Sequence, residues 1–539
     1  MISNICLSPI TAWLVAFSIT ALIIRTVTQR RKLLVQLPGP PPAGWIKGHF
    51  SSLVGSGSVA FQEKIVAEHG PTLKLNGGFG ILRLCIRFWS RKEQNSSDLL
   101  ALFSYFALSL EVVYWHKVLL NPVFTMKFLR ELMPIFMGIA KQTCEGIKKD
   151  LKLSKSSSKE VDVFPWATVA ALELVGEAGL GYSFSSFTGE RNEYNIAIKS
   201  VMGLVVLTEA SAYRQVFSKM GPFIKVLPLV YHIGTTSLRR WMLKHIPHRD
   251  IQQLRYAVGI QNQQAEEVIQ TRQALISSGD DLSSQAGRGR DIMTLLMKAN
   301  ETAGSDSYVD HQGMVGHMNT AVARILDILA DRPRAQVRLR EEIREYFENN
   351  PDDTHYDGLL ELPYLDAVVR EVLRLHGPVS FLNRICEEDT ILPLQFPVDT
   401  PSGKVTSIPI KKGTRVFMSV SVSNRFGGIW GERAHEFMPE RWIGSKIDEV
   451  TKPGAQLPGV YSSMMTFGAG SRACIAYSGF KFAIMEIKVM VAELVKDFKF
   501  EPSQEEHNWE TYNIQFPYVK KDLDDPARVP KLPLKVVQI

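Results

Sequence analysis

The chain has few cysteines for its length and no strong excess of charge of either sign. Its 539 residues include 5 cysteines, an odd number, and no two of them form a Cys-x-x-Cys pair. This usage is typical of a reducing compartment and argues against a disulfide framework. The formal net charge of +7 is modest and gives no indication of a nucleic-acid partner. The chain also has no internal repeat, and its 45% hydrophobic residues are enough to bury a large core.

Charge is absent from the first 24 residues, and this absence indicates where the protein resides. Residues 10–24 form an apolar run, and Arg25, Arg30, Arg31 and Lys32 follow it. This order predicts a retained membrane anchor whose C-terminal side faces the cytosol. A cleaved signal peptide is the alternative, but its basic residues usually precede the apolar run. The sequence therefore predicts a membrane anchor (1–26), a basic and proline-rich hinge (27–50) and one large domain (51–539).

A loop near the C-terminus carries the most specific signal. It reads Phe-Gly-Ala-Gly-Ser-Arg-Ala-Cys from Phe467 to Cys474 and precedes an apolar segment. A thiolate that ligates haem iron needs free backbone N–H groups, small residues that approach a flat porphyrin, and a cation for a propionate. Gly468, Gly470 and Arg472 meet these needs, and Phe467 would keep water from the sulfur. Two other interpretations remain open: a dinucleotide-binding glycine loop and a buried cysteine that acts as a small hydrophobe.

Two further motifs stand upstream of this loop. Apolar residues at helical spacing predict a helix over residues 363–375, with Glu371 and Arg374 on one face. Taken alone, this i,i+3 pair is more typical of a solvated surface. The stretch Pro-Glu-Arg-Trp ends at Trp442, between that helix and the cysteine loop. In this order and spacing the three motifs resemble the cytochrome P-450 family of haem-thiolate monooxygenases, fungal microsomal type.

The resemblance implies a fold class and roles for individual residues. The implied fold is mainly α with a small β region (α+β), the cytochrome P-450 fold, preceded by a single N-terminal transmembrane helix. Cys474 would ligate the iron of haem (iron protoporphyrin IX). Arg384 would bind a second propionate, with a plain surface arginine as the alternative. Glu371, Arg374 and Arg441 would form a buried cluster beneath the haem, in which two guanidinium groups satisfy one carboxylate.

The resemblance also implies a reaction and a location. The enzyme would insert one oxygen atom of dioxygen into an organic, lipophilic small molecule. Electrons would come from NADPH through a separate NADPH-cytochrome P-450 reductase, since the chain shows no flavin or nicotinamide domain. The catalytic domain would face the cytosol from the endoplasmic reticulum membrane, with membrane lipid around the anchor.

Three segments depart from the family pattern. Residues 310–330 lack the usual acid and alcohol motif of the oxygen-side helix: either Asn319 and Thr320 replace the acid and the alcohol, or the motif is missing after Thr320. We favour the second alternative, because both flanks resemble intact family sequence. Residues 81–120 do not resemble the family. After Cys474, either Ala476 replaces the family's glycine or residues 476–478 are an insertion.

These departures lead to a hypothesis about the chain and to two rival functions. The hypothesis is that the sequence is a mis-spliced or degenerate version of a working enzyme. One rival function is that of a catalytically impaired haem-binding membrane protein. The other is that of an enzyme of the same fold that rearranges a peroxide and needs no proton relay.

Hydrophobic periodicity elsewhere predicts mostly helix, with short strands. The predicted helices cover residues 121–149, 162–180, 252–276 and 335–347, and the short strand-like pieces include residues 414–421.

Overall fold

The structure is a computed structural model of the full chain, and it describes the following residues. These are 37–41, 48–49, 52–53, 57–76, 82–86, 126–153, 158–184, 187, 235–245, 249–278, 312–351, 356–444, 447–452, 455–470, 473–474, 479–511, 514–523, 525 and 528–539.

The described helices include long core helices and short turns that lead into the cysteine loop. The longer helices are α2 (Ser58–His69), α5 (Met126–Leu153), α6 (Val163–Leu174), α10 (Thr236–Lys244), α11 (Arg249–Ser278), α13 (Gln312–Ala330), α14 (Pro333–Asn349), α16 (Pro363–His376) and α20 (Gly479–Asp497). The shorter ones are η5 (Val175–Leu180), α15 (Tyr356–Leu360), α17 (Val420–Ser423), α18 (Gly427–Trp430), η9 (Pro439–Trp442), α19 (Ile447–Val450), η10 (Met465–Phe467) and η12 (Lys520–Asp522).

The described strands form four separate sheets. Their orders are β1-β2-β7-β4, β3-β11-β8, β5-β6 and β10-β9. Within the first sheet only β2 and β7 pair in parallel. The strands are β1 (Thr72–Asn76), β2 (Leu82–Ile86), β3 (Ser158–Asp162), β4 (Phe381–Ile385), β5 (Thr390–Thr400), β6 (Gly403–Ile410), β7 (Arg415–Ser419), β8 (Phe498–Pro502), β9 (His507–Thr511), β10 (Gln515–Val519) and β11 (Pro533–Gln538).

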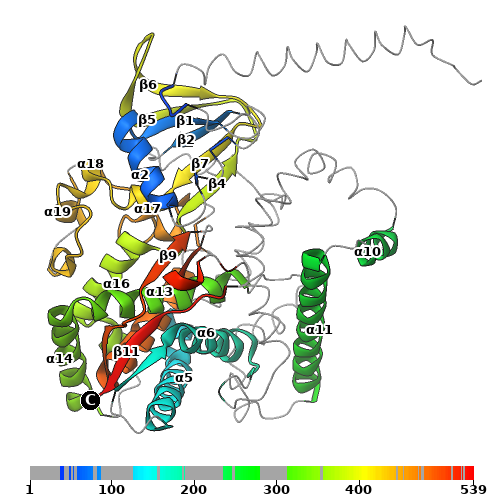
Figure 1. The fold of residues 1–539 in the computed structure, drawn as a ribbon, viewed down its shortest axis with the longest axis vertical. Helices are drawn as coiled ribbons and strands as arrows, with labels where there is room; N and C mark the ends of the chain where they lie inside the picture. Colours follow the sequence, from blue (N-terminus) through cyan, green and yellow to red (C-terminus); the bar gives the residue numbers. More distant parts are fainter. Residues whose placement is uncertain are drawn as a thin grey trace, which may run out of the picture.

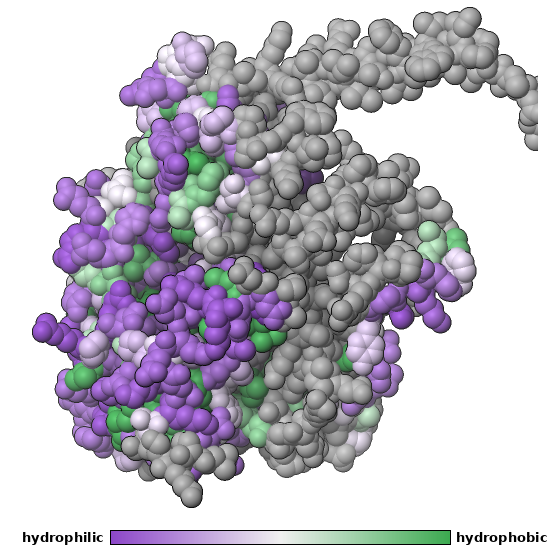
Figure 2. All heavy atoms as spheres, in the orientation of Figure 1, coloured by the Kyte–Doolittle hydropathy of each residue, from purple (hydrophilic) through white to green (hydrophobic). Residues whose placement is uncertain are grey.

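One end of the protein is rich in strands, and the other combines helices with strand β11 (Figure 1). Figure 1 shows β1, β2 and β4 to β7 with α2 at one end, and α5, α6 and α14 at the other. One hydrophobic core joins α5, α6, α13, α16 and α20. Figure 2 shows that the described residues on the face toward the viewer are mainly hydrophilic. The motifs found in the sequence therefore lie on elements that a common apolar core holds together.

Helix α16, which carries Glu371 and Arg374, is fixed at its N-terminal end. Pro363 occupies its first turn, where a missing N–H costs nothing. The Glu342 carboxylate of α14 accepts hydrogen bonds from the backbone N–H groups of Tyr364 (2.8 Å) and Leu365 (2.9 Å). This contact caps the helix from a neighbouring element, because the first N–H groups of a helix have no partner within it. The apolar stripe of the predicted helix is fully buried.

The predicted helices are confirmed, with small differences at their ends. Residues 121–125 lie outside the described ranges, and α5 continues to Leu153. The helix predicted over 162–180 begins at Val163, with Asp162 as its N-cap, and its last turn, η5, is a π-helix. Helices α11 and α14 extend two to three residues beyond the predicted bounds at each end.

The strand predicted over 414–421 is confirmed as β7, which is shorter and covers Arg415–Ser419. The hydroxyl of Ser419 accepts a hydrogen bond from the N–H of Val422 (3.2 Å) and so starts helix α17. A serine that caps a helix satisfies an otherwise unpaired N–H, which outweighs the strand propensity of the valines that follow.

Residues 1–36, which contain the predicted anchor, lie outside the described ranges. Among the described residues, a single helical stretch, Val163–Leu180, is long and apolar enough to cross a membrane, and 72% of it is buried inside the protein. It is formed by α6 and η5 and belongs to the core. The described piece of the predicted hinge packs on the body: Leu37 is buried, and the Pro38 carbonyl accepts from the Lys74 N–H of β1 (2.9 Å).

Candidate functional site

The cysteine loop folds back on itself between η10 and α20. Gly468 (φ 71°) and Gly470 (φ 68°) both adopt left-handed backbone conformations, which glycine reaches without steric cost. The N–H of Ala473 donates to the carbonyl of Gly470 (3.0 Å), and the N–H of Cys474 donates to the carbonyl of Phe467 (2.8 Å). The two glycines thus let the chain reverse, and the backbone bonds set Cys474 beside the start of its own loop.

Three cysteines have described side chains, and their surroundings differ. Cys144 and Cys386 are buried, whereas Cys474 is half-buried. Burial raises the pKa of the Cys144 thiol, and Asp497 and Glu493 nearby raise it further. Burial also raises the pKa of Cys386. Because the thiolate is the form that ligates metals, these two environments are unsuited to ligation, and Cys474 is the candidate among the three.

Three aromatic rings frame the loop. The ring of Phe467 lies 5.6 Å from that of Tyr461 and 5.9 Å from that of Phe480, and the rings of Tyr461 and Phe480 are 5.7 Å apart. Such spacings are favourable for aromatic pairs. Phe480 belongs to the first turn of α20, so the trio ties the beginning of that helix to the beginning of the loop.

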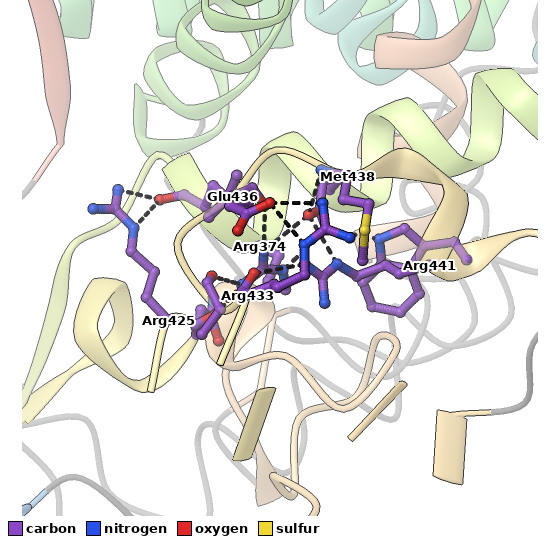
Figure 3. A network of polar contacts seen from close by, with 11 residues as sticks. Arg374, Arg425, Arg433, Glu436, Met438 and Arg441 are labelled. Carbon is purple, nitrogen blue, oxygen red and sulfur yellow. Dashed lines mark hydrogen bonds and ion pairs between the residues drawn. The ribbon is translucent and has the colours of Figure 1, made fainter. Parts of the chain in front are cut away.

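Glu371, Arg374 and Arg441 are in direct contact, and the two residues on α16 have fully buried side chains. Glu371 and Arg374 are both 0% exposed. Figure 3 shows the network around Arg374 and Arg441, where α16 meets the segment that leads into η9. The Glu371 carboxylate accepts from Arg374 Nε (3.0 Å), Arg374 Nη2 (2.9 Å), Arg441 Nε (2.9 Å), Trp442 Nε1 (2.9 Å) and the Met438 N–H (3.0 Å).

The cluster holds two guanidinium groups for one carboxylate, and backbone carbonyls face the extra positive charge. Arg374 donates to the carbonyls of Asn424, Ala434 and Glu436, and Arg441 donates to that of Arg433. Burial lowers the pKa of Arg441; Glu371 raises it, and the charge of Arg374 lowers it further. Sequence reasoning missed the bonds from Trp442 and the Met438 backbone, although Trp442 stands in the motif that indicated the cluster.

The remaining predicted site residues that the structure describes lie on two other elements, β4 and α13. Arg384 is half-buried on β4, in register with Val416 of β7. Arg472 lies outside the described residues. Asn319 and Thr320 are buried on α13, where Asn319 Nδ2 donates to Thr168 Oγ1 of α6 (2.9 Å). The Thr320 hydroxyl donates to Asn319 Oδ1 at 3.4 Å.

Comparison with known proteins identifies the family of this chain. The sequence model described as Cytochrome P450 matches residues 106–521, so this chain belongs to the cytochrome P450 family. Cytochrome P450 monooxygenase 91 of Postia placenta is 33% identical over 536 residues, which cover 94% of each chain. Cytochrome P450 monooxygenase 212 of the same organism is 33% identical and covers 97% of this chain and 98% of its own. Ganoderic acid synthetase of Ganoderma lucidum is 31% identical, with 96% and 98% covered.

These findings confirm the predicted family, its fold of mixed helix and strand, an oxidoreductase as the enzyme class, and haem as the cofactor. The family also implies a redox partner and a small-molecule substrate. The described residues fit haem, since a half-buried thiol stands on a closed loop whose glycines carry no bulky side chain.

Proposed function

We propose that this protein is a membrane-anchored haem-thiolate monooxygenase that inserts one oxygen atom of dioxygen into a lipophilic small molecule, with Cys474 as the iron ligand. The observation that supports this most is the half-buried Cys474 on a loop closed by the Phe467 carbonyl. When bound, the haem would supply dioxygen activation, which a thiolate ligand promotes by donating electron density.

The chain's own residues would hold the haem and shape its surroundings. Phe467 and its aromatic partners would exclude water from the sulfur, and Gly468 and Gly470 would let the loop approach the porphyrin. Arg472 and Arg384 would bind the propionates. The cluster of Glu371, Arg374 and Arg441 would fix the layer beneath the haem.

The electron source and the location extend the same proposal. Electrons would come from NADPH through NADPH-cytochrome P450 reductase, a redox partner of the kind that the family implies. The uncharged run within residues 1–26, followed by basic residues, supports a single-pass anchor in the endoplasmic reticulum with the catalytic domain toward the cytosol.

The oxygen side supports a second candidate, a haem-binding protein with impaired turnover or an enzyme that rearranges a peroxide. A side-chain amide has no titratable proton, so Asn319 cannot relay protons as a carboxylic acid does. Its amide also donates to Thr168 of α6. If Asn319 and Thr320 nevertheless replace the acid and the alcohol of the family motif, they would relay protons through ordered water.

A transcript that encodes this sequence in an active strain would refute the hypothesis of mis-splicing or degeneration.

The experiment is a spectrum of the reduced, full-length, haem-loaded protein under carbon monoxide. We expect the red-shifted thiolate band, and we expect Cys474→Ala to abolish it. Cys386→Ala is the matched control, because Cys386 is a buried cysteine whose thiol contacts the Glu388 carbonyl, and the band should persist. A Cys474→Ala protein that keeps the band would overturn the assignment.

Turnover with reductase and NADPH distinguishes the two candidates. A set of lipophilic test compounds is incubated with the complete system, and NADPH consumption, peroxide and oxidised product are measured. Product formation supports the monooxygenase. NADPH consumption with peroxide and no product supports the impaired protein, and conversion of an added organic peroxide without NADPH supports the rearranging enzyme.

A further inference from the structure

Asn424 is a fully buried residue that contacts both the Glu371 cluster and the approach to the cysteine loop. It follows α17 and is 0% exposed. Its backbone carbonyl accepts a hydrogen bond from Arg374 Nη1 (2.9 Å). Its side-chain Oδ1 accepts from the N–H of Met465 (2.8 Å), and its Nδ2 donates to Thr466 Oγ1 (2.9 Å). One residue thus connects α16 with η10, the turn that carries Phe467.

Thr466 makes a second connection to the same helix. Its hydroxyl donates to the carbonyl of Leu373 on α16 (2.8 Å). The close approach depends on Gly377, because a Cβ there would lie 3.0 Å from both Thr466 Cγ2 and the Leu373 carbonyl oxygen. From Thr466 one peptide leads to Phe467, whose carbonyl accepts from the N–H of Cys474 (2.8 Å). The chain of bonds therefore runs from the buried cluster to the backbone of the cysteine.

The pattern of donors and acceptors requires an amide at position 424. The single hydroxyl proton of Thr466 is used on the Leu373 carbonyl, so Thr466 can only accept from Asn424. The Met465 N–H needs an acceptor. An amide offers a donor and an acceptor on one planar group. Aspartate would lack the donor and place a charge in a buried site, and alanine would offer neither.

We propose that Asn424 is a positioning residue for the thiolate ligand, which sets the turn Met465–Phe467 against α16 and thereby holds Cys474 at the iron. This inference rests on the proposed role of Cys474. The residue does not touch the iron or the substrate, and its effect is transmitted through the Phe467 carbonyl.

The test compares Asn424→Ala with a buried amide that serves a different region of the core. Gln336 is 2% exposed and accepts from the Phe500 N–H (2.9 Å) while it donates to the carbonyls of Phe500 (2.9 Å) and Leu329 (3.0 Å). Both variants lose buried hydrogen bonds, so both should lower the thermal midpoint. The readout that separates them is a ratio of two bands in the spectrum of the reduced carbon monoxide complex. One band belongs to protein in which the thiolate ligates the iron, and the other to protein in which the thiolate has been displaced.

We expect Asn424→Ala to lower this ratio about tenfold, since two buried hydrogen bonds to the turn are lost. Gln336→Ala should leave the ratio unchanged. If Asn424→Ala changes only the thermal midpoint, as Gln336→Ala does, Asn424 is merely structural and the inference is wrong. A wild-type protein without the thiolate band would instead refute Cys474 as the ligand.

Thr466→Val keeps the inference testable if Asn424→Ala does not fold. Valine has nearly the shape of threonine but neither accepts from Asn424 nor donates to Leu373. We expect a decrease of the same ratio, because this variant also loses two buried hydrogen bonds of the turn, and an unchanged ratio in a folded Thr466→Val protein would contradict the positioning role.

Discussion

Replacement of Glu371 by glutamine is the sharpest test of the buried cluster. Three of the five donors reach Glu371 Oε1 and two reach Oε2. A glutamine has one acceptor oxygen, so at least two donors would face its NH₂ group, and the guanidinium groups of Arg374 and Arg441 would lose their only carboxylate in the described network. Breaking a buried ion pair by removal of one partner costs about 3–5 kcal/mol. That is a large fraction of the roughly 5–15 kcal/mol by which a domain is stable.

The assay for Glu371→Gln is the urea midpoint and the haem content of the purified full-length protein. We expect both to decrease strongly. Glu440→Gln, in the neighbouring motif, is the matched control, because Glu440 is 53% exposed and pairs with the similarly exposed Arg338. Exposed pairs contribute about 0–1 kcal/mol, so this variant should resemble wild type. If the two variants behave alike, the cluster does not stabilise the fold through its buried ion pairs.

Two further predictions concern buried carboxyl groups. Burial raises the pKa of Glu486 well above its usual value, so the folded state keeps its proton while the unfolded state loses it above about pH 4.5. Glu486→Gln should therefore raise the thermal midpoint at pH 7, with a gain that shrinks toward pH 4.5; a gain independent of pH would contradict the reasoning. Burial raises the pKa of Asp327, but the hydrogen bond from His507 and the charge of Arg324 outweigh it, and the net shift is downward. The contribution of Asp327 to folding stability is present above its unfolded pKa and is lost as pH falls through the lower folded pKa. Asp327→Asn should therefore make the stability depend less on pH on the acid side. An unchanged dependence would exclude Asp327 as the origin of the acid-side loss of stability.

Much of the local structure and the centre of the site could be predicted from sequence. The apolar stripe of α16 follows from i,i+3 and i,i+4 spacing, which is a property of neighbouring residues. The two glycines of the cysteine loop take the left-handed conformations that their lack of a Cβ permits. The spacing of the three motifs indicated the family, and the family indicated that Glu371, Arg374 and Arg441 meet.

Only the tertiary structure decided which distant groups complete these local elements. Ser419 ends a strand because its hydroxyl caps α17, and Asn319 turns toward α6 because Thr168 offers an acceptor there. The bond of Arg374 to the Asn424 carbonyl joins residues 50 positions apart, and that of Trp442 to Glu371 joins residues 71 apart. Periodicity cannot specify such contacts, because they exist only when the apolar faces of several elements pack together and bring buried polar groups of distant segments within hydrogen-bonding distance.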